Sequence, residues 1–146
     1  MHLRVLALAV IAACAGASAA TASEAAKAGE GPSLMLELNA VKPAGSACRI
    51  AFVVKNELGT AIKDLGFELV LFDKSQRVQT VLSVAAGSMP VAKTRVKQFD
   101  LKGIDCDSIG RVLLNDVSRC DGEGLSAAGC LKAARPSSKT PIPFDF

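Results

Sequence analysis

Cysteines are the residues of this 146-residue sequence with the greatest capacity for covalent or metal chemistry. Four of them, Cys48, Cys106, Cys120 and Cys130, follow a leading segment that has the layout of an export signal. An even number of cysteines in an exported chain predicts structural disulfides, and four cysteines allow three pairings. The sequence has no C-x-x-C pair and no histidine after His2, so a redox pair or a zinc site is the lesser interpretation.

The spacing of the cysteines narrows the three pairings. Residues 109–117 read as a strand whose ends lie roughly 30 Å apart, and this strand separates Cys106 from Cys120. Because disulfide-bonded Cα atoms lie within about 7 Å of each other, a Cys106–Cys120 bond is disfavoured. We expect Cys48–Cys106 and Cys120–Cys130, with Cys48–Cys120 and Cys106–Cys130 as the alternative.

Acidic residues crowd the C-terminal third of the chain, and four of them form a candidate metal site: Asp105, Asp107, Asp116 and Glu123. Carboxylate oxygens in loops suit calcium, but the spacing fits no EF-hand, so solvated loop acids are the competing interpretation. A Ser-His-Asp or Cys-His centre is excluded after export, because the single histidine, His2, lies in the signal. We expect neither catalysis nor a cofactor; an envelope enzyme or metal-dependent protein that uses these acids is the alternative.

Three basic residues, Lys93, Arg95 and Lys97, occupy alternate positions of an expected strand, 93–101. Alternate residues of a strand point to the same face, so the three side chains form a basic stripe. One interpretation is a solvated face or a charged edge strand that discourages sheet-to-sheet association. The other is a docking patch for an acidic partner or for anionic lipid headgroups.

The elements that must position these residues are short strands. Residues 65–73 predict a central strand, because Phe67, Leu69 and Leu71 face one side while Val70 and Phe72 face the other. Further strands are expected at 34–41, 48–55, 78–84, 93–101 and 109–117, with a loop at 85–90. The tail predicts a short helix at 124–134 and an extended end at 140–146. This pattern predicts an immunoglobulin-like antiparallel β-sandwich with a short disulfide-closed C-terminal segment.

The N-terminus has the features of a signal peptide over residues 1–19: a basic start, a short apolar run and the small residues Ala17-Ser18-Ala19. A rival interpretation is a lipobox ending at Cys14, which would anchor the protein by a lipid. We expect a flexible leader at 20–33, the sandwich at 34–119 and the C-terminal segment at 120–146. Secretion to the periplasm is the expected outcome, and the apolar run is too short to span a bilayer.

The charge of the chain excludes one class of function. The formal net charge is +3, and removing the signal with its Arg4 leaves 16 basic residues against 14 acidic ones. A nearly balanced domain with no Trp and no Tyr lacks both the basic footprint and the stacking platforms of nucleic-acid binding. We therefore expect another envelope protein as the partner.

Several short motifs resemble a family of exported proteins of alphaproteobacteria that bear twin-arginine or Sec signals. The resemblance extends over the mature chain and all four cysteines, and rests on Leu36-Glu37-Leu38-Asn39, Cys48-Arg49, Phe72-Asp73, Phe99-Asp100, Val112-Leu113-Leu114-Asn115-Asp116-Val117 and Ser137-Ser138. This chain departs from the family in lacking two adjacent arginines in its signal, which favours Sec export. The resemblance implies a four-cysteine immunoglobulin-like sandwich and transfers no activity. The strands from Val54 to Asp73 also resemble binding or spacing modules of bacterial envelopes.

Overall fold

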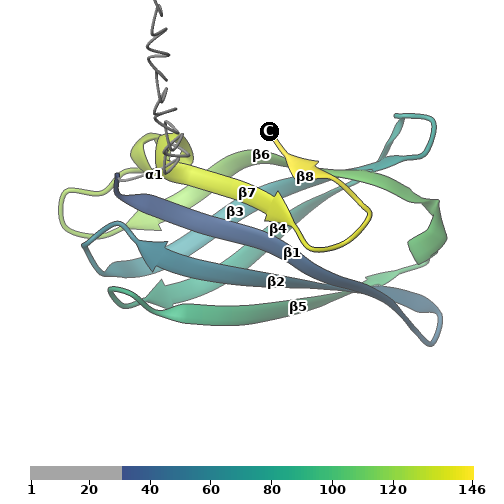
Figure 1. Ribbon diagram of the computed structural model, residues 1–146, viewed down its shortest axis with the longest axis horizontal. Helices are drawn as coiled ribbons and strands as arrows, with labels where there is room; N and C mark the ends of the chain where they lie inside the picture. The colour runs from purple at the N-terminus through teal and green to yellow at the C-terminus, as the bar shows by residue number, and fades with distance from the viewer. Residues whose placement is uncertain (1–30) are drawn as a thin grey trace, which may run out of the picture.

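Two four-stranded sheets pack face to face in a computed structural model that describes residues 31–146 (Figure 1). The first sheet has the order β5-β2-β1-β7, with β1 at Ser33–Ala44, β2 at Ala47–Glu57, β5 at Thr94–Lys102 and β7 at Ala134–Ser138. The second has the order β4-β3-β6-β8, with β3 at Ile62–Asp73, β4 at Val78–Met89, β6 at Ile109–Asp121 and β8 at Phe144–Asp145. The predicted β-sandwich is confirmed.

The core lies between the two sheets and is built from alternate strand positions. On β3, Phe67, Leu69 and Leu71 are fully buried, as expected for a strand between two neighbours. They face a layer from β1 and β2 that includes Phe52. The Phe52 ring lies edge-on to Phe67 and to Phe144, with ring centroids 6.4 and 5.3 Å apart. Most of the remaining core is Leu, Ile and Val, which matches the scarcity of aromatic residues.

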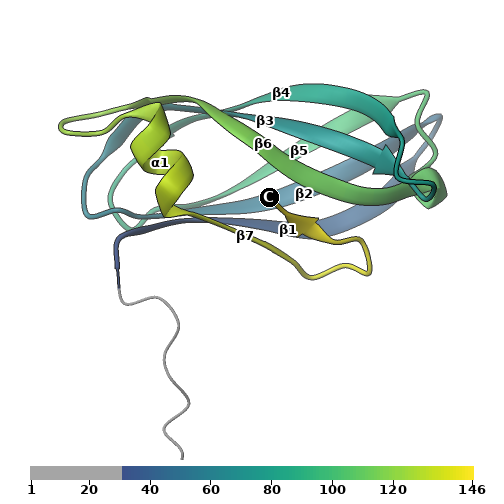
Figure 2. The same ribbon diagram turned by 90° about the horizontal axis from the view of Figure 1, so that it is seen from above.

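The two C-terminal strands run parallel to their neighbours, which differs from the predicted all-antiparallel arrangement. The short helix α1 (Ala127–Ala133) lies across one end of the sandwich, between β6 and β7 (Figure 2). It delivers Ala134 next to Leu34 at the start of β1, so β7 continues in the direction of β1. A helical crossing between sheets is the physical reason for a parallel neighbour here.

The boundaries predicted for β4 and for the helix are wrong, and β1 and β6 also run past their predicted ends, to Ala44 and Asp121. β4 continues to Met89, through the segment expected to be a loop at 85–90. Ala86 and Met89 are buried in the core, and Gly87 takes a left-handed conformation (φ 72°) that accommodates shifts in the pairing with β3. The helix is also shorter than residues 124–134, because Ser126 caps it by accepting the N–H of Gly129.

Both expected disulfides are confirmed. Cys48–Cys106 joins β2 to the 3₁₀ turn η1 (Cys106–Ser108), and Cys120–Cys130 joins the end of β6 to α1. The expected signal peptide, its Cys14 and the leader up to residue 30 lie outside the described residues. Within residues 31–146, no helix combines the length and the apolar composition needed to cross a bilayer.

Candidate functional site

The basic stripe lies at the border of the core rather than on the outer face of its sheet. β5 is an edge strand that pairs only with β2, and the register places Arg95 opposite Val54 and Lys97 opposite Phe52. Directly opposite residues share a face, and Val54 and Phe52 are fully buried core residues. Arg95 and Lys97 are therefore half-buried on the core-facing side of the edge.

Lys93 and the residues on the outer face of β5 are more exposed than Arg95 and Lys97. Lys93 lies in the turn before β5 and is exposed. The outer face carries Thr94, Val96 and Gln98, and the Val96 side chain is 61% exposed. The edge thus has cations on its inner side and an exposed apolar residue on its outer side.

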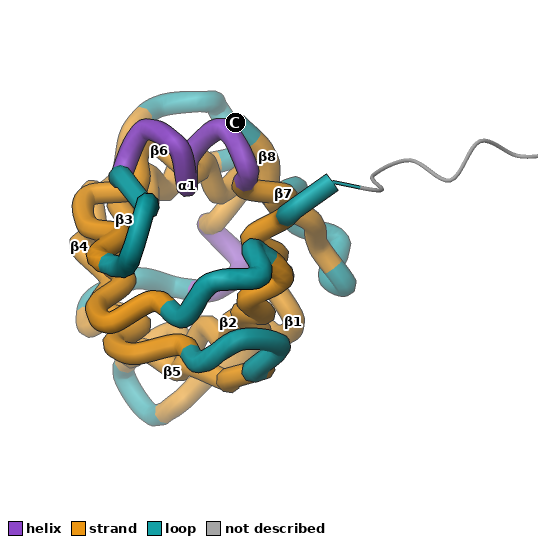
Figure 3. The backbone as a smooth tube through the Cα atoms, turned by 90° about the vertical axis from the view of Figure 1, so that its left-hand side faces the viewer, coloured by secondary structure: helices purple, strands orange, loops and turns teal. Residues whose placement is uncertain are grey.

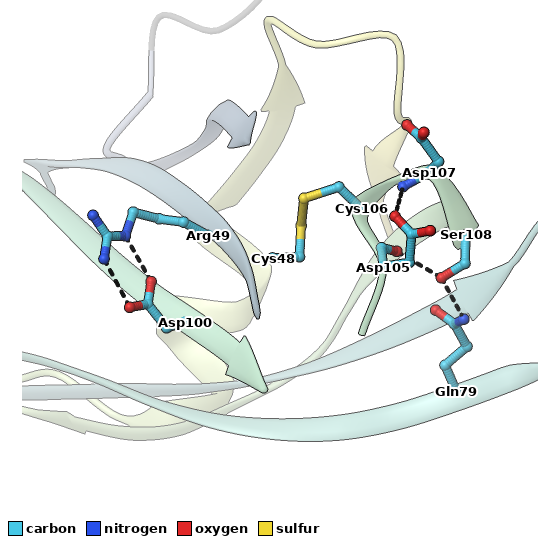
Figure 4. Close-up of a disulfide and its surroundings, with 8 residues drawn as sticks. All are labelled: Cys48, Arg49, Gln79, Asp100, Asp105, Cys106, Asp107 and Ser108. Carbon is cyan, nitrogen blue, oxygen red and sulfur yellow. Dashed lines mark hydrogen bonds and ion pairs between the residues drawn. A yellow bond between two sulfur atoms is a disulfide. The ribbon is translucent and has the colours of Figure 1, made fainter. Parts of the chain in front are cut away.

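The three stripe cations form no ion pair with any residue in the described part of the chain, residues 31–146. By contrast, Arg49 and Asp100 form a bidentate ion pair on the outer face of β2 and β5 (Figure 4). The Nε–Oδ1 and Nη2–Oδ2 distances are 2.6 and 2.7 Å. The Arg49 guanidinium lowers the pKa of Asp100 by hydrogen bonding, and Asp100 raises the pKa of Arg49. The Arg95 Nε atom is buried and has no acceptor within the described residues. An unpaired buried donor is unfavourable, so Arg95 is the group at this edge that a carboxylate would satisfy best.

The backbone of β5 offers free hydrogen-bonding groups on alternate residues. The N–H of Asn56 donates to the carbonyl of Lys93. Since bonded and non-bonded pairs alternate along an antiparallel ladder, the backbones of Arg95 and Lys97 bond to β2. The N–H and C=O groups of Thr94, Val96 and Gln98 therefore point away from β2, to the open side.

Asn56 positions the start of this edge, and it is the one buried polar residue of the described chain. Its side-chain amide donates to the carbonyls of Thr60 and Met89, each at 2.8 Å, and its oxygen accepts the N–H of Leu58 at 3.0 Å. One side chain thus fixes both the β2–β3 turn and the β4–β5 turn. The strand predicted from the sequence ended at residue 55, so this role of Asn56 was missed. The signal was present, because Asn56 continues the inward-facing series Ile50, Phe52 and Val54.

The β4–β5 turn that Asn56 holds has a left-handed residue that is not glycine. Lys93 N–H donates to Pro90 carbonyl, and Ala92, at φ 58°, lies at the third position of this four-residue turn. The N–H of Ala92 donates to the carbonyl of Asn56, and the N–H of Asn56 donates to the carbonyl of Lys93. Ala92 and Lys93 therefore both lie opposite the single residue Asn56. This arrangement is a β-bulge, which fixes where β5 begins.

The four candidate metal ligands do not converge. Asp105 caps η1 by accepting the N–H of Asp107 at 3.0 Å (Figure 4), whereas Asp116 lies opposite Glu68 in the second sheet. Glu123 lies in the turn between β6 and α1. Asp107 borders a cavity of about 430 Å³, and Asp105 borders a separate one of about 350 Å³; Cys106 lines both. Among residues 31–146, no three Asp, Glu, Cys or His side chains are grouped so as to hold a metal ion.

The fold and its covalent bonds define a class: a β-sandwich of two four-stranded sheets stapled by two disulfides. The disulfides indicate an oxidising, extracytoplasmic location. The solved structure of IrmA from Escherichia coli is similar, with a TM-score of 0.57 over 76% of this chain and 96% of IrmA, at 12% sequence identity. At that identity the likeness shows the fold alone. No protein-family model matches the sequence, and no curated protein matches it.

Proposed function

We propose that this protein is a non-catalytic interaction module of the bacterial periplasm and that it binds another envelope protein. The observation that carries the proposal is the open β5 edge, whose inner side presents Arg95 and Lys97 with no ion-pair partner among residues 31–146. An exposed sheet edge supplies main-chain donors and acceptors in a row, which is the basis of strand addition by a partner protein.

The disulfides support the location, since they require an oxidising compartment. The resemblance of its motifs to those of exported alphaproteobacterial proteins supports the periplasm in particular, with Sec export as the route. The competing anchoring mode, lipidation at Cys14, changes where the module is held and leaves the binding edge the same.

Site-specific photo-crosslinking in the native host tests the proposal. A photoreactive residue at Val96 reports on β5, and the same residue at Val78 is a matched control on β4, since the two valines are 61% and 60% exposed. We expect a discrete adduct with one envelope protein from position 96, absent from position 78, and direct binding once that protein is purified. No adduct from position 96, or the same adducts from both positions, would overturn the proposal.

A further inference from the structure

β5 is one of two long edges that the sandwich leaves open. The other edges are blocked: β7 has 5 residues and contains Pro136, and β8 has 2 residues. The long edges, β4 with 12 residues and β5 with 9, lie next to each other on one side of the molecule, with β7 and β8 on the other (Figure 3). An added strand would therefore pair with β4 or β5.

Of the two long edges, β5 has the more regular backbone. Its register with β2 runs without interruption from Ala47↔Lys102 to Lys55↔Thr94, whereas the β4–β3 register shifts at three places. Bulges twist an edge away from a straight partner strand, so an uninterrupted register favours addition to β5.

We infer that β5 accepts an extended segment of another protein, added antiparallel, that carries carboxylates at alternate positions. This inference rests on the proposed function and names the partner's chemistry. The added strand would bond to the free backbone groups of Thr94, Val96 and Gln98. Arg95 and Lys97 would then lie in the non-hydrogen-bonded pairs, where opposite Cα atoms approach to about 4.5 Å and side chains are closest. Glu or Asp at those positions gives each cation a partner, through a charge-assisted hydrogen bond with the guanidinium in the case of Arg95.

The outer face of β5 determines which residues of the added strand alternate with the carboxylates. Residues of the added strand that face outward meet Thr94, Val96 and Gln98, and Val96 is largely exposed. β-branched residues pack well against such a surface. The segment is therefore one in which acidic and β-branched residues alternate.

A second copy of this chain is a poor occupant of the same edge. Pairing β5 with β5 would set Arg95 and Lys97 of one copy against the same cations of the other, and like charges directly opposite destabilise a sheet. The uncharged strand β4 of a second copy would leave the cations unpaired.

Calorimetric titration of the folded, disulfide-bonded protein tests the inference. The probe is a peptide as long as β5 in which Glu and Thr alternate, and its controls are a Lys/Thr peptide and the same Glu/Thr peptide N-methylated along the edge that would bond to β5. We expect the acidic peptide to bind at low salt. The lysine and N-methylated peptides should not bind, because one has the wrong charge and the other lacks the donors.

Variants of the protein separate local pairing from general charge. Arg95→Gln/Lys97→Gln should weaken binding of the acidic peptide by roughly tenfold or more. Lys63→Gln/Lys139→Gln removes the same charge from exposed lysines that make no ion pair within residues 31–146, and should have little effect. If the first variant does not fold, the N-methylated peptide still decides the question on the unmodified protein.

Four results would overturn the inference. Equal binding of the N-methylated peptide, or equal loss in the two variants, would mean diffuse charge attraction rather than strand addition. A dimer that forms through β5, detected by ultracentrifugation, would mean that a second copy takes the edge. If the acidic peptide does not bind although position 96 gives a specific crosslinked adduct, the inference of an acidic strand is refuted and the proposed function stands.

Discussion

Ala92 and Asn56 set the geometry from which β5 starts, and both act through the backbone of the β4–β5 turn. Ala92 has a left-handed backbone (φ 58°), which disfavours side chains that have a Cβ atom. Asn56 lies fully buried beside it and bonds to the carbonyls of Thr60 and Met89. Single substitutions at these residues therefore report on the turn without changing a side chain of the stripe.

We expect Ala92→Gly to leave stability unchanged or raise it by up to about 1 kcal/mol, because glycine adopts positive φ without strain. The matched control is Ala85→Gly on β4, an exposed alanine that does not have positive φ. There glycine should cost roughly 0.5–1 kcal/mol through the entropy of the unfolded chain. Urea denaturation of both variants measures this, and a loss of stability in Ala92→Gly as large as in Ala85→Gly would contradict the turn geometry.

We expect Asn56→Ala to destabilise the fold by roughly 2–4 kcal/mol, since it leaves buried carbonyls without a donor. Asn115→Ala is the control, because the Asn115 amide bonds to Glu68 at an exposed position and its loss should change stability by less than about 0.5 kcal/mol. Denaturant midpoints compare the two. Similar small losses in both would mean that Asn56 does not hold the two turns together.

At the scale of elements, the two disulfides close loops of very different length. Cys48 and Cys106 are 58 positions apart, whereas Cys120 and Cys130 are 10 apart. In the chain-entropy account, these bonds stabilise by about 4 and about 3 kcal/mol. Replacing Cys48 and Cys106 by alanine should therefore lower the unfolding free energy more than replacing Cys120 and Cys130. The reverse order in denaturant titrations would contradict an account based on loop length.

The elements that could be predicted from the sequence are those that a local sequence pattern determines. Alternation of apolar residues correctly predicted β3 and its buried face, because burial on one side imposes a period of two. Disulfide geometry correctly disfavoured Cys106–Cys120, and of the two pairings that it left open the expected one is present. The second half of β4 was missed, since its small residues around Gly87 carry no strong period.

The remaining misses depend on tertiary contacts. The parallel strands β7 and β8 follow from the path of α1 across the end of the sandwich, which no local pattern encodes. The stripe Lys93, Arg95 and Lys97 could be found as a set, but the position of Arg95 and Lys97 on the core-facing side could not, because that depends on the register with β2. Asn56 continues the inward-facing apolar series of β2, but the strand predicted from the sequence ended at residue 55.

At the scale of the whole molecule, hydrogen bonds to carboxylates make the free energy of unfolding depend on pH in the acid range. The pKa of Asp73 is lowered mainly by the backbone N–H of Arg77, that of Asp100 by Arg49, and that of Glu57 by Lys55 and then Ser33. The unfolded chain binds protons at these groups more tightly than the folded chain does. Stability is thus complete above the ordinary carboxyl pKa and falls as the pH drops from about 4 through the lower folded values.

We expect stability to be nearly constant between about pH 5 and pH 8, because the chain has no histidine after His2. Denaturant midpoints measured from acid to neutral pH check this, and Asp100→Asn should make the decline in acid shallower. A transition centred between pH 6 and 7 would contradict this assignment of the titrating groups.

The claim that β5 is an open edge ready for a partner strand is tested most directly by amide hydrogen exchange, residue by residue. In the free protein, Arg95 and Lys97 amides should be protected and those of Val96 and Gln98 should exchange quickly. With the acidic peptide bound, we expect the amides of Val96 and Gln98 to become protected while those of β4 stay unchanged. Uniform protection along free β5, or protection that appears on β4 instead, would contradict it.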